Sequence, residues 1–157
     1  MHVKRSVLER LEDFRAWGRT GAAPGAAPIT LLDYVGFVAL PDSVFAFAEL
    51  FFPELVEHEG RKYLASRFSS AAYDTWIEAG RSAEEAQRLM NHLHVCWLIQ
   101  NQPIDDEMAL DIASAIAKVW TRTLGPEGLT VEVEGTTFDD AAVTFFDQRP
   151  RAGVGSQ

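Results

Sequence analysis

Two histidines and the single cysteine of the chain fall within one five-residue window of the apolar stretch 82–100. His92 and Cys96 are four residues apart, so a helix would place them on one face, where imidazole and thiolate can bind a metal ion. His94 would point about 160° away at roughly 100° per residue, so one helix cannot gather all three. Further ligands would come from a separate segment of the sequence, at Glu57, His58 or Glu59.

The metal hypothesis competes with a simpler interpretation, in which Cys96 is a small core residue and the histidines lie at the edge of the core. The simpler interpretation is favoured, because no second ligand pair has diagnostic spacing. A thiol buried in mid-helix would have a raised pKa and little reactivity, which disfavours a Cys–His hydrolase. The sequence lacks phosphate-loop, nucleophile-elbow and zinc-protease motifs. We therefore assign no catalytic residue and no cofactor, and favour a protein that is not an enzyme.

The stretch 82–100 is predicted to form a buried central helix around which the fold is organised. Ser82 and Glu85 match a capping box at its start, and Pro103 ends it. Apolar residues recur at three- and four-residue steps and then cover both faces after Leu93, which is typical of a buried helix. Polar and charged residues within the stretch, among them Glu84, Glu85, Arg88, Asn91, His92 and His94, exclude a membrane span.

Negative charge is concentrated in the last third of the chain. The net charge is −9, and residues 101–147 carry ten acidic groups against Lys118 and Arg122, a local charge of −8. Such a surface repels nucleic acid and attracts a basic protein. The competing interpretation is that the acidic groups only keep the protein soluble. The candidate partner-binding residues are Asp105, Asp106, Glu107, Asp111, Glu132, Glu134, Asp139 and Asp140.

The remaining patterns predict an α+β protein, mostly helical, with about five or six helices around the central one. Capping residues and apolar stripes predict helices over 6–17, 30–40, 41–52, 69–79 and 106–124, although 30–40 also has strand-like composition. In the helix from Pro41, Phe45, Phe51 and either Phe47 or Ala48 are predicted to face inward. Two β-hairpins, over 55–65 and 129–147, are predicted to form a small antiparallel sheet.

The domain organisation follows from composition. Residues 21–28 read Gly-Ala-Ala-Pro twice, which offers no core side chain and forbids helix. We expect an N-terminal amphipathic helix over 1–18, a linker over 19–28, a compact domain over 29–148 and a disordered tail over 149–157. A helix on such a linker could exchange between two copies, which would make a homodimer.

Three functional hypotheses remain open. The first is a small acidic cytoplasmic module that binds a basic protein, with an immunity- or antitoxin-like inhibitor as its concrete form; only size, charge and compartment suggest this. The second is a metal- or histidine-dependent enzyme that uses His58, His92 and Cys96. The third is a homo-oligomeric accessory subunit. One cysteine and no apolar leader favour a cytoplasmic protein without a membrane anchor.

Overall fold

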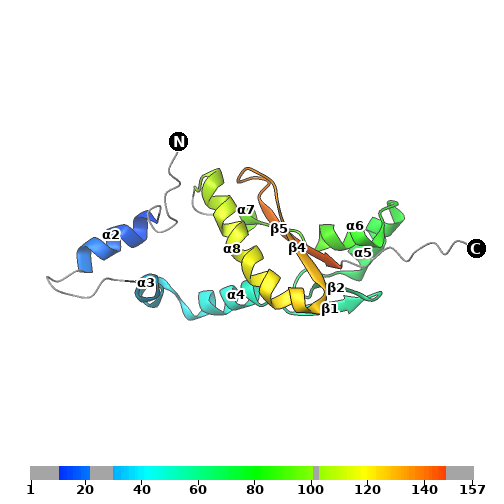
Figure 1. Ribbon diagram of the computed structural model, residues 1–157, viewed down its shortest axis with the longest axis horizontal. Coiled ribbons are helices and arrows are strands. Elements are labelled where there is room, and N and C mark those ends of the chain that lie inside the picture. The colour runs from blue at the N-terminus through cyan, green and yellow to red at the C-terminus, as the bar shows by residue number, and fades with distance from the viewer. Residues whose placement is uncertain (1–10, 22–29, 101–102, 148–157) are drawn as a thin grey trace, which may run out of the picture. The chain divides into compact units, whose positions relative to one another are not determined.

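The computed structural model describes residues 11–21, 30–100 and 103–147 of the chain (Figure 1). The chain divides into two compact units, Met1–Phe47 and Ala48–Gln157. Residues 1–10, most of the expected linker and the expected tail lie outside the described residues. The α+β class predicted from the sequence is confirmed, with seven α-helices and five strands among the described residues.

The first unit contains helices α2 (Glu12–Gly21) and α3 (Leu31–Val38), together with most of α4 (Pro41–Phe51). The Tyr34 ring of α3 contacts the rings of Phe14 and Trp17 on α2, with centroids 5.6 and 5.5 Å apart. The helical prediction for residues 30–40 is confirmed. The first helix was predicted to end at residue 17, which is wrong, because α2 continues to Gly21.

The second unit alternates short strands and helices along the chain. Its elements after α4 are β1 (Leu55–His58), β2 (Arg61–Leu64), α5 (Ser70–Glu78), α6 (Ala83–Met90), β3 (Leu93–His94), α7 (Val95–Leu98), α8 (Asp106–Leu124), the 3₁₀ turn η1 (Gly125–Glu127), β4 (Leu129–Glu134) and β5 (Ala142–Asp147). The predicted hairpins are confirmed, but they form separate sheets. Strands β1 and β2 pair with each other, and a second, antiparallel sheet has the order β3-β5-β4.

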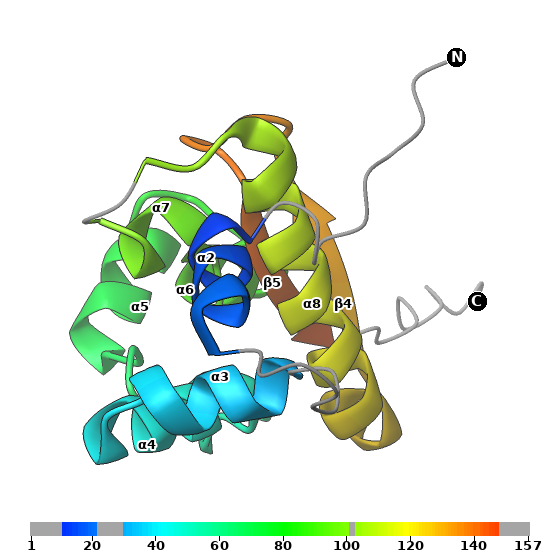
Figure 2. The same ribbon diagram turned by 90° about the vertical axis from the view of Figure 1, so that its left-hand side faces the viewer.

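Helix α8 and strand β5 form the centre of the second unit (Figure 1 and Figure 2). Trp120 of α8 meets Phe145 of β5 edge to face, with ring centroids 5.6 Å apart, so the odd-numbered side chains of β5 face α8. The even-numbered side chains face α6, since Arg88 stacks on the Phe146 ring and the Thr144 hydroxyl donates to the Arg88 carbonyl. Strand β5 is therefore covered on both faces.

The predicted central helix over 82–100 is wrong. Its first half forms α6, with the expected capping box between Ser82 and Glu85, but the helix ends at Met90. Asn91 then turns the chain, Leu93 and His94 pair with β5, and a new single-turn helix begins at Val95. The apolar pattern matched a helix across this break, because hydrogen bonds to distant strands leave no mark on local periodicity.

Two buried amide side chains explain why the chain turns at this point. Asn91 accepts a hydrogen bond from the Leu64 amide (3.0 Å) and donates to the carbonyls of Lys62 (3.1 Å) and Phe145 (3.2 Å). Gln87 donates to the Lys62 carbonyl and the Asp147 carboxylate, and accepts from the Asp147 amide and the Arg61 guanidinium. Both amides are fully buried. Their hydrogen bonds therefore connect β2 to β5.

Elsewhere, turn and capping residues were sufficient to predict the local structure. The β1–β2 hairpin turns at Glu59 and Gly60, whose φ angles of 49° and 71° fit the expected two-residue turn. Val56 pairs with Tyr63 across this hairpin, which was predicted over 55–65. Helix α8 has the predicted bounds, and Asp105 caps it by accepting a hydrogen bond from the Met108 amide at 2.7 Å.

The turn after β4 depends on a glycine, and Gly135→Ala should destabilise the protein more than Gly128→Ala. Both glycines have φ near +80°, which costs a side chain about 1 kcal/mol or more. A Cβ at Gly135 would also lie 2.2 Å from the backbone oxygen of Asp140, whereas a Cβ at Gly128 meets no atom within 4 Å. Urea denaturation of both variants measures the difference. Equal losses of stability would contradict this description of the turn.

Candidate functional site

Helix α4 exposes aromatic and aliphatic side chains to solvent along its length. None of its residues is buried. Phe45 is 75% exposed and Phe47 is 56% exposed, and Ala48 is exposed as well, so the prediction that Phe45 and one of Phe47 and Ala48 face inward is wrong. Large exposed apolar residues continue on either side of them, at Val35, Val38, Leu40, Val44 and Phe52. An apolar surface of this kind on a protein usually marks an interaction site.

The last turn of α4 belongs to the second unit and is attached to its core. Leu50 and Phe51 pack against the hydrophobic core of the second unit. The Trp120 indole N–H donates to the Leu50 carbonyl at 2.9 Å, and this bond holds the end of the helix against α8. Phe45 lies on the opposite side of the helix from Leu50 and Phe51. At about 100° per residue, the five and six steps that separate them correspond to net rotations of about 140° and 120° around the helix axis.

Only acidic charges accompany this apolar surface. Asp42 precedes Phe45 by three residues and Glu49 follows it by four, so both carboxylates share the Phe45 face. Both are exposed. Residues 30–60 carry six carboxylates and no lysine or arginine. We name Asp42, Phe45 and Glu49 the α4 face. The α4 face could not be predicted from the sequence. Periodicity indicates an apolar stripe on a helix but not whether another element covers that stripe.

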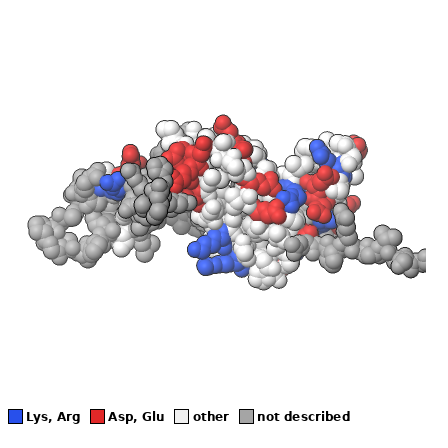
Figure 3. All heavy atoms as spheres, turned by 45° about the horizontal axis from the view of Figure 1, so that its top comes forward, with Lys and Arg blue, Asp and Glu red and all other residues white. Residues whose placement is uncertain are grey.

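Five of the predicted partner-binding residues gather at one end of the second unit. Asp105, Asp106 and Glu107 begin α8, while Asp139 and Asp140 lie in the β4–β5 loop. The Phe138 amide donates to Asp106 at 2.7 Å, which brings the two segments together. Figure 3 shows acidic side chains clustered over this region. We name these five residues the acidic end. Asp111 is half-buried further along α8.

Some of these carboxylates also have local structural roles. Asp140 accepts hydrogen bonds from the amides of Thr136 (2.8 Å) and Thr137 (2.6 Å) and from the Thr137 hydroxyl (2.9 Å). These bonds lower the pKa of Asp140 below its ordinary range. Asp105 caps α8. The acidic end is therefore held in a defined conformation by its own hydrogen bonds.

Glu132 and Glu134, also predicted to bind the partner, do not join the acidic end. Both bind the Arg88 guanidinium from α6, Glu134 at 2.9 Å. Their charges are partly neutralised by this pairing, and their side chains lie on the α6 side of β4. A sequence pattern could not reveal this, because Arg88 lies more than forty residues earlier in the chain.

The histidines and the cysteine do not form the predicted helical pair. His92 follows the end of α6 and Cys96 lies in α7, so the two side chains no longer share one helix face. Cys96 instead contacts the Asp139 carbonyl at 3.8 Å. His58 packs among aromatic rings on the β1–β2 hairpin. Within residues 11–21, 30–100 and 103–147, no group of three or more His, Cys, Asp or Glu is arranged to hold a metal ion.

His92 belongs to a stack of rings on the surface of the second unit. The rings of His92 and His94 are 4.4 Å apart, and the same distance separates His94 from Trp97. The Arg67 guanidinium covers the Trp97 ring at 4.7 Å and donates to the His92 carbonyl at 2.9 Å. The Nε2 atom of His92 lies 3.5 Å from the Glu134 carboxylate.

Stability should fall as the pH is lowered through the range where His92 titrates. Burial lowers the pKa of His92 below its ordinary value of about 6.5, as do His94 and two arginines, while Glu134 opposes them. Below about pH 6.5 the unfolded chain takes up a proton at this residue that the folded chain does not, so stability falls until the folded pKa is reached. Thermal melts across this range should show a smaller pH slope for His92→Gln. An unchanged slope would contradict this assignment.

A second aromatic cluster surrounds the hairpin and is explained by packing. Tyr63 and Tyr73 are buried against Met90 and Ala86, and the Tyr73 hydroxyl donates to Glu59 at 2.7 Å. Burial raises the pKa of Tyr63 to about 12, so its hydroxyl stays neutral at physiological pH. This cluster therefore attaches the hairpin to α5 and α6.

The exposed features described above are the α4 face, the acidic end and the stack formed by the rings of His92, His94 and Trp97. No helix of the described residues is both long and apolar enough to cross a membrane. Comparison of the chain with protein-family models, with curated proteins and with solved structures gave no match.

Proposed function

We propose that this chain is a protein-binding module that captures a basic partner protein through the α4 face. The observation that carries the proposal is the side chain of Phe45, three-quarters exposed and flanked on its own helix face by two carboxylates. An exposed phenylalanine is the kind of residue that anchors an interface once a partner excludes water from it.

The charge of this surface selects the partner. Asp42 and Glu49 would pair with lysine or arginine placed around an apolar pocket that receives Phe45. A second copy of the chain is a poor partner for the α4 face. Two α4 faces would bring like charges together, and residues 30–60 contain no lysine or arginine to pair with them. Nucleic acid is excluded by the same argument.

The acidic end contributes at longer range. Together with a net charge of −9, it would raise the rate at which a cationic protein approaches. A module of this kind acts by occupying its partner's basic surface, and an immunity- or antitoxin-like inhibitor is the concrete form that we favour.

The test uses tagged full-length protein as bait in a lysate of the source organism. Phe45→Ala should weaken binding of the captured protein by about tenfold or more, as expected for an anchor residue. The double variant Asp42→Asn, Glu49→Gln should weaken it less and reduce its dependence on salt concentration. Matched controls are Trp76→Ala and Glu78→Gln on α5, which should bind as the wild type does.

The expected partner is basic and is released by salt. A captured protein that is acidic, or one whose affinity is the same for the α4 variants and the α5 controls, would contradict the proposal. Circular dichroism of each variant confirms that the fold is retained, since Phe45 makes no buried contact whose loss would unfold the protein.

A further inference from the structure

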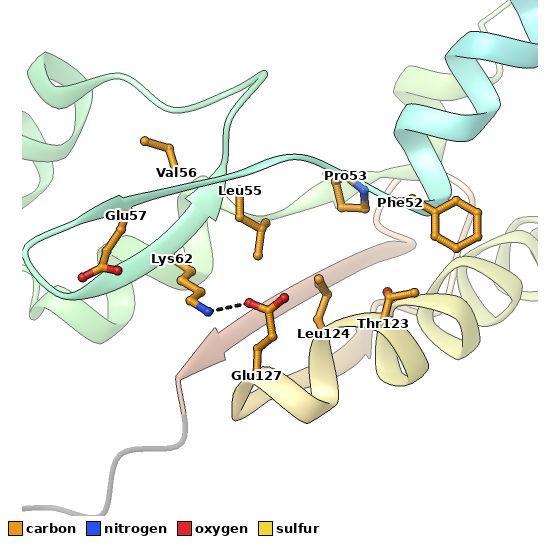
Figure 4. Close-up of a pocket in the computed structure, with 9 residues that line it drawn as sticks. All are labelled: Phe52, Pro53, Leu55, Val56, Glu57, Lys62, Thr123, Leu124 and Glu127. Carbon is orange, nitrogen blue, oxygen red and sulfur yellow. Dashed lines mark hydrogen bonds and ion pairs between the residues drawn. The ribbon is translucent and has the colours of Figure 1, made fainter.

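A pocket of about 450 Å³ lies between the β1–β2 hairpin and the C-terminal end of α8 (Figure 4). Volumes of this size are typical of small-molecule sites. Leu55 points toward Leu124 across it, and Phe52 stands at one end. The Lys62–Glu127 ion pair closes the other end. The residues that line it are Phe52, Pro53, Leu55, Val56, Glu57, Lys62, Thr123, Leu124 and Glu127.

The two ends of the pocket differ in chemistry. Phe52, Pro53, Leu55 and Leu124 form an apolar wall that an alkyl chain could cover, and Phe52 is 66% exposed in its absence. At the other end, Glu57 and Glu127 stand against a single cation, Lys62, so the local charge is −1. The pocket is therefore suited to a molecule with an apolar body and one charged head.

The polar groups at this pocket favour a head that donates hydrogen bonds. The Lys62 ammonium is already bound by Glu127, and this bond raises the pKa of Lys62, so the lysine stays charged. The Thr123 hydroxyl donates to the carbonyls of Val119 (3.1 Å) and Trp120 (3.4 Å), which leaves its oxygen as an acceptor. Thr123 lies near Phe52, away from Glu57 and Glu127 (Figure 4), so the two carboxylates are the groups that can accept N–H donors from the head. An anion would meet both carboxylates and be repelled.

We propose that this pocket binds an alkylguanidinium group, with its cation at Glu57 and Glu127 and its alkyl chain along Leu55 and Leu124 toward Phe52. A guanidinium presents several N–H donors in one plane, stays charged at every physiological pH and is weakly hydrated. The group has two sources, a free small molecule or an arginine side chain of a protein. The pocket shares no residue with the α4 face, so either proposal can fail without the other.

The experiment follows backbone amide shifts of the ¹⁵N-labelled full chain by NMR. Titration with n-butylguanidinium should shift Leu55, Lys62 and Leu124 in a saturable manner. Pentanoate, of similar length and opposite charge, should not, and unsubstituted guanidinium should bind more weakly because it lacks the chain. Glu57→Gln and Glu127→Gln should each weaken binding by about three- to fivefold, and Glu54→Gln, outside the pocket, should not.

A second arm separates the two sources. A short peptide with one arginine is compared with the same peptide carrying citrulline, which keeps the shape and removes the charge. Saturation by free n-butylguanidinium supports a small-molecule ligand, and saturation by the arginine peptide alone supports a protein side chain. The proposal is overturned if neither cation saturates these shifts, or if pentanoate or the citrulline peptide binds equally well.

Discussion

Asn91→Ala is expected to lower the free energy of unfolding by about 3 kcal/mol, because it leaves buried backbone groups without partners. The Asn91 amide is fully buried and bonds the Leu64 amide and the carbonyls of Lys62 and Phe145. Alanine can replace none of these bonds, and water has no access to the site. The loss should therefore exceed what the removed volume alone would cause. Urea denaturation followed by circular dichroism measures it.

The matched control for this substitution is Gln100→Ala, which removes an exposed amide that donates to the Trp97 carbonyl of its own turn. We expect a change below about 0.5 kcal/mol there, as for most surface substitutions. If Asn91→Ala were as mild as the control, α6 would not hold the two strands through this residue.

Trp120→Ala is the second substitution with a large expected effect, about 3–5 kcal/mol of lost stability. The Trp120 side chain is 1% exposed, packs edge to face on Phe145 and donates its indole N–H to the Leu50 carbonyl. Alanine would leave a large cavity between α8 and β5. Thermal and urea unfolding of the variant measure this loss.

Trp120→Phe separates the two roles of this residue. Phenylalanine keeps most of the ring and loses the bond to Leu50, so a loss of about 1–2 kcal/mol is expected. Hydrogen exchange should then increase at the end of α4 more than in α8. Trp76→Ala on α5, where the ring is already 37% exposed, serves as the control and should change stability little. Equal losses at Trp76 and Trp120 would contradict the assigned core.

Elements whose signals are local could be predicted from the sequence. Asp105 and Gly125 bracket an apolar stripe, and α8 has the predicted bounds. Alternation over residues 129–134 and 142–147 gave both strands of the second hairpin. The Glu59-Gly60 turn fixed the register of the first. In each case neighbouring residues carry the information, because caps and turns involve groups only a few positions apart.

The interruption of the predicted central helix could not be found in this way. Asn91 looks like a polar interruption of an apolar helix until Leu64 and Phe145 are known to lie beside it. The local pattern favours a continuous helix, but buried backbone groups must be hydrogen-bonded, and here a side chain from another element bonds them. Such pairs are separated by 27 and 54 positions in the chain.

The α4 face was not predicted from the sequence. Among the candidate partner-binding residues, Asp106 is connected to the loop after Phe138 by one hydrogen bond. Glu132 and Glu134 pair instead with Arg88 of α6, which lies far from them in the sequence. Phe45 was assigned to the interior because hydrophobicity does not report which side of a helix is covered.

The side chains of α6 have a consequence for self-association. Beyond its two-residue pairing with β3, the outer edge of β5 presents the Phe145 carbonyl and the Asp147 amide to Asn91 and Gln87. Those groups are thus unavailable to a strand from a neighbouring molecule, which is how an apolar strand such as Ala142–Asp147 avoids templating a fibril.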